Sequence, residues 1–340
     1  MGAYFLRRLF LMVPTLLGAT FLIFLITRIV PGGPIEQMIV RAQQGGEGGA
    51  LGSRQGAIEI PQSVMQELRR YYRLDMPAWK AYALWLGDVA RLDLGKSYKY
   101  ATPVLDVIVS RFPVSVYFGF VGFALGYAVS IPLGVYKAIR HAGTFDAVSS
   151  AIIFAGYSIP GWALGAILIV YFGGGSFWSI IPLGGFRSPG WDGFTISHKI
   201  TDQLHHTIAP MLCYAVGSFA TLTVLMKNSL MENLGQDYVR TAYAKGLPGR
   251  RVIFRHALRN SLIPICTGLG HAISLVLAGS YLIERVFNID GIGYLAYTSI
   301  TERDYTVVMG YLAISTFLTL AGNVLSDLLY VVVDPRIRFS

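Results

Sequence analysis

Few side chains in this sequence have the types and spacing that enzyme chemistry needs. Ser158 lies in the run Gly156-Tyr157-Ser158-Ile159-Pro160, which departs at its last position from the Gly-x-Ser-x-Gly turn of serine hydrolases. His205 and His206 have no acidic residue at the spacing of the His-Glu-x-x-His zinc helix, so we interpret them as interfacial side chains. The sequence therefore predicts no catalytic residue, and an enzyme that processes lipid or peptide is the weaker alternative.

The sequence also lacks the patterns of cofactor and metal sites. The run Gly173-Gly174-Gly175-Ser176 does not match the Gly-x-x-x-x-Gly-Lys-Ser/Thr pattern of a phosphate-binding loop. Cys213 and Cys266 both lie in apolar segments, so we interpret them as small buried residues and not as a zinc site or a disulfide framework. We expect no cofactor and no metal.

The segment 236–260 has the most specific pattern in the chain. It begins with a short helix that Gly246 can close, because glycine readily adopts the left-handed conformation found at helix C-termini. Pro248 fits the opening turn of a second helix, in which arginines recur every four residues beside an apolar stripe. The basic edge holds Arg251, Arg255 and Arg259, and the stripe holds Phe254 and Leu258. We expect a helix–turn–helix with one basic edge and one apolar edge.

The elements that carry this segment belong to a membrane protein. Apolar residues make up 54% of the chain and charged residues only 14%, and the mean hydropathy is +0.52. Soluble domains carry about 25% charged residues, so a water-soluble fold could not bury this much apolar surface. In a membrane protein, a net charge of +9 bears first on which side of the membrane the basic residues lie. We therefore expect no nucleic acid as a partner.

Six windows are long and apolar enough to cross a bilayer, which takes about 20 residues. The first window is too long for a signal peptide and no small-x-small cleavage site follows it, so we expect an uncleaved span. The windows are 9–30, 114–136, 147–172, 208–226, 263–283 and 306–333. The predicted fold class is an all-α polytopic membrane protein with six transmembrane helices.

Basic residues are unevenly shared between the short loops, which favours cytoplasmic N- and C-termini. With that orientation the short outer loops hold only Arg187, Lys199, Arg285 and Arg303. The inner segments hold Arg7, Arg8, Lys137, Arg140, Lys227, Arg240, Lys245, Arg250, Arg251, Arg255, Arg259, Arg336 and Arg338. A basic inner loop can arise from this rule alone, or can rest on anionic lipid, so charge by itself does not assign a function to 236–260.

Ionisable side chains are rare within the windows. The second, third and fourth contain no Asp, Glu, Lys or Arg. We interpret His271 in the fifth as a hydrogen-bonded bundle residue, and Asp327 in the sixth as an interfacial acid near Arg336 and Arg338. Ion-coupled transporters usually keep ionisable groups near the membrane midplane. An ion-coupled secondary transporter is therefore an alternative that the uncharged windows disfavour.

The long segment 31–113 is predicted to form an extracytoplasmic cap. It opens with the helix stop Pro31-Gly32-Gly33-Pro34, and a glycine-rich flexible loop follows over 43–56. Two short amphipathic helices come next, separated by Pro77. Their apolar positions are Val64, Met65, Leu68, Tyr71 and Tyr72 in the first and Trp79, Tyr82, Leu86 and Val89 in the second. The cap either covers the bundle or is a docking platform for a soluble partner.

The inner loop resembles the coupling loop of ABC importer permeases of the dipeptide/oligopeptide (Dpp/Opp) class. The class pattern Asp-Tyr-Val-Arg-Thr-Ala-x-Ala-Lys-Gly-Leu stands here as Asp237 to Leu247, and the run 254–260 is also similar. Further matches along nearly the whole chain resemble the Yej-type subgroup, whose members import oligopeptides and the peptide–nucleotide antibiotic microcin C. These matches are 1–4 with Arg7-Arg8, 31–34, 44–49, 72–77, 130–134 and 334–337.

The resemblance implies a type I importer permease, multi-pass in the bacterial inner membrane. It implies that the 236–260 loop couples to an ATPase through Asp237, Tyr238, Arg240, Thr241, Ala242, Lys245, Gly246, Leu247, Arg251 and Arg255. This chain has Arg240 at the position where the wider importer motif Glu-Ala-Ala-x-x-x-Gly has its glutamate. The resemblance therefore implies no carboxylate contact to the ATPase at that position. The implied divisions are the N-terminus with the first span (1–30), the cap (31–113), a five-span permease core (114–333) and a cytoplasmic tail (334–340).

The resemblance also implies the partners. They are a second homologous permease subunit, separate cytoplasmic ATP-binding subunits, an extracytoplasmic substrate-binding protein, a peptide substrate and membrane lipid. When the ATPases close on ATP, the short helix would pass their motion to the spans as a rigid element. Families with similar loops carry dipeptides, nickel complexes or glutathione. Because the sequence shows no clustered His or Met, we expect a peptide.

Overall fold

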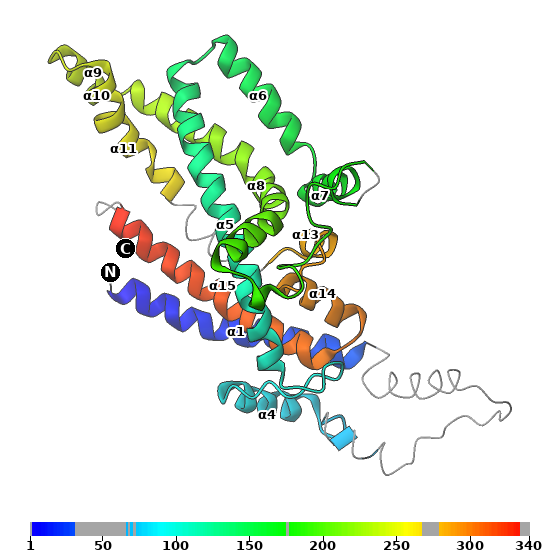
Figure 1. Cartoon of the computed structure of the whole chain (residues 1–340). Helices are drawn as coiled ribbons and strands as arrows, with labels where there is room; N and C mark the ends of the chain where they lie inside the picture. Colours follow the sequence, from blue (N-terminus) through cyan, green and yellow to red (C-terminus); the bar gives the residue numbers. More distant parts are fainter. Residues whose placement is uncertain are drawn as a thin grey trace. The chain divides into compact units, whose positions relative to one another are not determined.

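The computed structural model describes residues 2–30, 66, 69–70, 73–174, 177–266 and 279–333. All the named elements of this described part are helices (Figure 1), which confirms the all-α prediction for it. They are α1 (Gly2–Ile29), α4 (Ala78–Ala90), α5 (Val104–Ile139), α6 (Thr144–Tyr157), α7 (Gly161–Leu168), the π-helix η2 (Ile169–Gly173), the 3-10 helix η3 (Trp191–Gly193), α8 (Ile196–Leu234), α9 (Asp237–Ala244), α10 (Gly249–Arg251), the π-helix η4 (Val252–Ala257), α11 (Leu258–Ser261), α13 (Tyr281–Val286), α14 (Ile292–Thr301) and α15 (Tyr305–Val333).

Four of these helices are long and apolar enough to cross a membrane, namely α1, α5, α8 and α15. They coincide with four of the six predicted windows. The third window falls on α6 and α7–η2, which together pass the same test but are bent by 86°. The described residues thus contain four candidate spans, or five if the bent pair crosses as one. The fifth window, with His271, lies largely outside the described residues, as do the glycine-rich loop and the predicted amphipathic helix around 64–72.

The bend in the third window has a local cause. Pro160 stands immediately before α7, and proline favours helix starts but cannot continue a preceding helix. Gly161 then lies so close to α8 that a Cβ atom would be 2.4 Å from the carbonyl oxygen of Cys213. A Cβ at Gly122 of α5 would likewise lie 2.8 Å from the Cβ of Tyr214. Small residues therefore let α5 and α7 approach α8 closely, as in other membrane bundles.

The chain divides into two compact units. The first unit comprises Met1–Arg8, Arg111–Tyr294 and Leu318–Ser340, and the second comprises Leu9–Ser110 and Leu295–Phe317. Among the described residues of the first unit, apolar side chains cluster around Phe118, Cys213 and Phe287 and around Met226, Leu230 and Val239. Cys213 is a buried free thiol as predicted, whereas Cys266 is only half-buried.

In the second unit, α4 packs along α1. The hydroxyl group of Tyr82 donates to the carbonyl oxygen of Leu17 at 2.8 Å, and its ring contacts Phe24. This confirms a helix after Pro77 that carries the predicted apolar positions, of which Trp79 is 70% exposed. Trp85 lies on the packed side with Tyr82, and its ring centroid is 6.5 Å from that of Phe24.

Asp327, in the first unit, has two partners on α1 that the sequence did not indicate. Its carboxylate accepts a hydrogen bond from the hydroxyl group of Tyr4 at 3.1 Å and pairs with Arg8. Both partners come from the start of α1, so α1 and α15 lie side by side at this end (Figure 1). The expected neighbours Arg336 and Arg338 lie outside the described residues.

Candidate functional site

The helix α9 follows α8 at one end of the first unit (Figure 1). Asp237 occupies its first turn, where a negative charge stabilises the helix dipole. Val239 and Ala242 are buried and pack against Met226 and Leu230 of α8. The predicted coupling residues Asp237, Tyr238, Arg240, Thr241 and Lys245 are exposed. The helix is therefore amphipathic, with one side fixed to the bundle and the other presented outward.

Gly246 ends α9 in the predicted way. Its φ angle is +78°, in the left-handed region that favours glycine. Its N–H donates to the carbonyl oxygen of Tyr243 at 2.9 Å, and the N–H of Leu247 donates to that of Ala242 at 3.4 Å. This pair of hydrogen bonds is the Schellman motif, and Leu247 packs on the same apolar cluster as Ala242.

The second half of the loop departs from a regular helix. Pro248 precedes α10 as its N-cap residue and so lies one position before the predicted opening turn. The π-helix η4 follows, with Val252 and Ala257 buried and Arg255 exposed. The predicted apolar stripe is only partly confirmed, because Leu258 packs against the core while Phe254 is 51% exposed.

Two serines close the loop where it returns to the bundle. The hydroxyl group of Ser229 in α8 donates to the carbonyl oxygen of Ser261 at 2.9 Å, and Ser261 Oγ approaches the carbonyl oxygen of Ser229 at 3.3 Å. Both side chains are buried, so water does not compete strongly for these contacts. With the apolar cluster, they tie α9 and α11 to α8.

The exposed side of this loop is basic. Asp237 is its only acidic residue, and its pairing with Arg240 at 3.5 Å joins two highly exposed side chains, which stabilises little. The exposed basic residues are Arg240, Lys245, Arg250, Arg251, Arg255 and Arg259. Such a surface attracts negatively charged groups, whether on a protein or on anionic lipid.

Residues 130–339 match the family described as the inner membrane component of binding-protein-dependent transport systems. The chain belongs to this family. Its members are permease components, in which the ATPase is a separate subunit, so the chain is not itself an enzyme. The matched range includes the whole 236–260 loop.

Full-length relatives agree with this membership. The peptidoglycan transport system permease protein YejB of Agrobacterium fabrum is 37% identical over 100% of this chain and 99% of its own length. The inner membrane ABC transporter permease protein YejB of Escherichia coli O157:H7 is 37% identical over the whole of both chains. The oligopeptide transport system permease protein AppB of Bacillus subtilis is 34% identical over the whole of both chains. The resemblance of this permease to the Dpp/Opp class and its Yej-type members is thereby confirmed.

The sequence did not reveal a charged cluster that α5, α6 and α8 form together. The carboxylate of Asp146, at the start of α6, forms ion pairs with two lysines. Its oxygens lie 2.7 Å from Lys227 Nζ of α8 and 3.1 Å from Lys137 Nζ of α5. The side chain of Lys137 is 1% exposed and also donates to the hydroxyl groups of Ser149 and Ser150. The signal in the sequence was weak, because each residue alone looks like an ordinary charge at the end of a span.

The histidine pair has two different environments. His205 is exposed, as an interfacial residue would be, but His206 is buried. The ring of His206 contacts the carbonyl oxygen of Gly185 at 3.0 Å and Ser188 Oγ at 3.1 Å, and Ser188 also donates to Asp202. Asp202 lies on the same side of the ring as Ser188, 3.7 Å from Nε2, whereas Nδ1 contacts the carbonyl oxygen of Gly185. In a catalytic triad the carboxylate binds the nitrogen that does not contact the serine, so this cluster fastens the 185–188 turn to α8 and does not form a triad.

Proposed function

We propose that this chain is one of two permease subunits of an ATP-driven, binding-protein-dependent importer of oligopeptides. Its family supports the transport role, and the names of two of its full-length relatives, which concern peptidoglycan and oligopeptide transport, support a peptide substrate. Microcin C-like peptides fit the same proposal. Dipeptides, nickel complexes and glutathione are the alternative solutes within the class.

The observation that carries the coupling role is the two-sided construction of α9. Val239 and Ala242 hold it on the bundle, while Tyr238, Arg240 and Thr241 face outward. A helix fixed in this way can transmit a push without bending, which is what a rigid link between an ATPase and the spans requires. We infer that an acidic groove on the ATPase receives this face.

The remaining assignments follow from this one. The ATPase side is the cytoplasm, so both termini are cytoplasmic and the chain crosses the inner membrane six times. Residues 31–113 then lie on the opposite side as a cap, where the soluble binding protein delivers peptide. A second, homologous permease completes the pathway with the five-span core 114–333.

The decisive experiment is isolation of the complex from its native membrane, followed by reconstitution. Affinity capture of this chain is expected to bring down an ATPase and a homologous permease. The reconstituted complex, supplied with the binding protein, is expected to take up labelled oligopeptide only when ATP is present. Uptake that needs an ion gradient instead of ATP would contradict the proposal, and uptake of a nickel complex or glutathione with no uptake of peptide would favour an alternative solute.

A further inference from the structure

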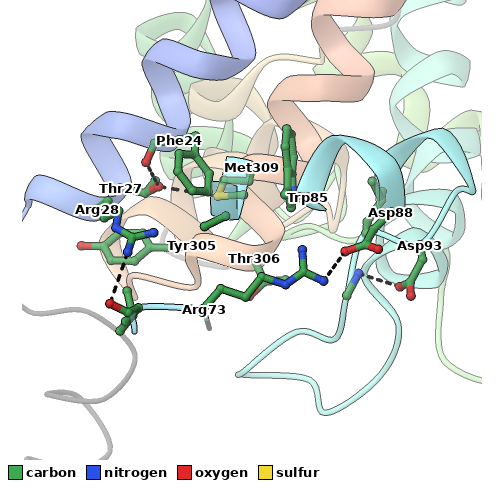
Figure 2. A pocket seen from close by; sticks show the side chains of 14 residues that line it. Phe24, Thr27, Arg28, Arg73, Trp85, Asp88, Asp93, Tyr305, Thr306 and Met309 are labelled. Atoms are coloured by element: carbon green, nitrogen blue, oxygen red, sulfur yellow. Dashed lines mark hydrogen bonds and ion pairs between the residues drawn. The ribbon is translucent and has the colours of Figure 1, made fainter. Parts of the chain in front are cut away.

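The second unit contains a cavity of about 260 Å³ between the end of α1, the helix α4 and the start of α15 (Figure 2). Thr27 of α1 contacts the sulfur of Met309 in α15 at 3.5 Å, which fixes these two helix ends together. Both helices are candidate spans, Tyr4–Ile29 and Tyr305–Leu328. The cavity therefore lies where two spans end, at the level of the lipid head groups.

Two charges of opposite sign line this cavity without an opposite charge beside them. Arg73 is neutralised by Asp88 at 2.7 Å. Arg28, in contrast, donates only to the carbonyl oxygens of Leu74 and Met76 among the described residues. Asp93 accepts the backbone N–H of Gly95 at 3.0 Å and has no ion pair within the described part of the chain. Figure 2 shows Arg28 and Asp93 at opposite ends of the cavity.

The walls become apolar toward the bilayer. Phe24 lies one helical turn deeper than Arg28 on α1, and Met309 lies one turn deeper than Tyr305 on α15. Trp85 of α4 completes this apolar part. The hydroxyl oxygen of Tyr305 is buried and has no hydrogen-bond partner among the described residues, although a buried hydroxyl group usually has one.

We propose that this cavity binds the head group of a phospholipid with a primary ammonium group, its phosphate at Arg28 and its ammonium at Asp93. The glycerol and the upper acyl carbons then lie against Phe24, Trp85 and Met309. Small-molecule pockets usually hold about 300–1,000 Å³, so this slightly smaller cavity fits a head group whose chains continue into the bilayer. The site does not depend on which solute the importer carries.

A phospholipid explains the cavity better than a transported peptide does. A peptide could also pair its two charged termini with Arg28 and Asp93. Its binding would not require the apolar wall that lies at the level of the acyl chains. A phosphatidylcholine head group would reach Arg28, but its quaternary ammonium has no N–H to donate to Asp93. A phosphatidylglycerol head group would bring no cation to Asp93 at all. The cavity therefore selects for phosphatidylethanolamine.

The test is photolabelling of the assembled importer in lipid nanodiscs. A phosphatidylethanolamine with a photoreactive group near the glycerol is expected to label peptides from α1, α4 or α15 of this chain. Arg28→Gln and Asp93→Asn are each expected to reduce that labelling about tenfold, the effect of losing one charge-assisted hydrogen bond. The matched controls are Arg91→Gln and Asp75→Asn, which change exposed charges that do not line the cavity.

Competition separates lipid from other occupants. Unlabelled phosphatidylethanolamine is expected to suppress the labelling more than phosphatidylcholine or phosphatidylglycerol does. Asp93→Asn is the cleaner variant, because an asparagine oxygen can still accept the N–H of Gly95, whereas Arg28→Gln also removes support from residues 74–76. The proposal is wrong if Asp93→Asn labels like wild type, if the label maps elsewhere, or if transported peptide protects the cavity and lipid does not.

Discussion

The hydroxyl group of Ser115 joins the carboxylate of Glu284 to the start of α14. Ser115 Oγ donates to Glu284 Oε1 at 2.9 Å and accepts the N–H of Ile292 at 2.7 Å. The second carboxylate oxygen accepts the N–H of Tyr294 at 2.7 Å. Ser115 is 1% exposed and Glu284 is fully buried. Because Ser115 belongs to α5 and Glu284 to α13, this one buried pair fixes the chain between α13 and α14 against α5.

Replacing Ser115 with alanine is expected to destabilise the protein by about 1–3 kcal/mol, because the Ile292 N–H and the Glu284 oxygen each lose a buried partner. Denaturant unfolding of the complex in mild detergent measures this change. The matched control is Ser110→Ala, an exposed residue whose hydroxyl group donates to the carbonyl oxygen of Val107 at 3.0 Å. Equal stability of the two variants would contradict the role given to Ser115.

Glu284 gives this pair a pH dependence. Burial raises the pKa of the Glu284 carboxyl group, although the N–H of Tyr294 and the Ser115 hydroxyl group act in the opposite direction. The folded state thus holds this proton more tightly than the unfolded state does. The resulting stability is present at acidic pH and is lost as the pH rises through the pKa of the folded state.

The variant Glu284→Gln removes that titration. The thermal midpoint of the wild-type complex, relative to that of Glu284→Gln, is therefore expected to fall as the pH is raised. Midpoints measured from pH 4 to pH 9 in one buffer series test this expectation, and a difference that does not change with pH would show that Glu284 does not titrate as described.

The cluster around Asp146 is expected to be more sensitive than either serine. Asp146→Asn leaves Lys137 and Lys227 without their shared carboxylate, and breaking a buried ion pair costs about 3–5 kcal/mol. We expect a strong loss of folded protein, measured as the yield of monodisperse complex after extraction. Lys227→Met removes a partly exposed cation and keeps Lys137 paired with Asp146, so its loss should be smaller. The opposite order of the two variants would contradict this account.

Local patterns in the sequence predicted the loop well. Gly246 and Pro248 act within a few residues of themselves, so their positions alone indicate where α9 ends and where the next helix begins. The π-helix η4 was not predicted, because its wider turn has no side-chain signature in a single sequence. The exposure of Phe254 follows from that change of register.

Contacts between distant residues could not be predicted in the same way. Ser115 and Glu284 are 169 positions apart, and Asp146 and Lys227 are 81 apart. Each residue alone fits an ordinary place at the end of an apolar segment, and only the folded bundle brings the partners together. The Arg28–Asp93 cavity could not be predicted for the same reason, since residues of α1, α4 and α15 form it together.

Gly246 provides the sharpest test of coupling. Its left-handed φ of +78° would strain a leucine by about 1–2 kcal/mol, but a Cβ there would meet no atom within 4 Å. The buried anchors Val239 and Ala242 are untouched by the change. Gly246→Leu is therefore expected to insert and assemble normally while the exposed side of the turn is displaced and enlarged. Peptide uptake and peptide-stimulated ATP hydrolysis should both fall, with basal hydrolysis retained.

Gly246→Asn is the matched control, because asparagine tolerates the left-handed region better than other residues with a side chain. It is expected to keep most of the coupled activity. A loss seen only with leucine would then be caused by strain in the backbone turn and by the size of the leucine side chain. Assembly is checked by capture of the ATPase with each variant. Gly246→Leu could instead assemble and hydrolyse ATP in response to peptide as the wild type does. The turn that holds the exposed face of α9 would then be dispensable, and the end of α9 would not transmit the motion of the ATPase.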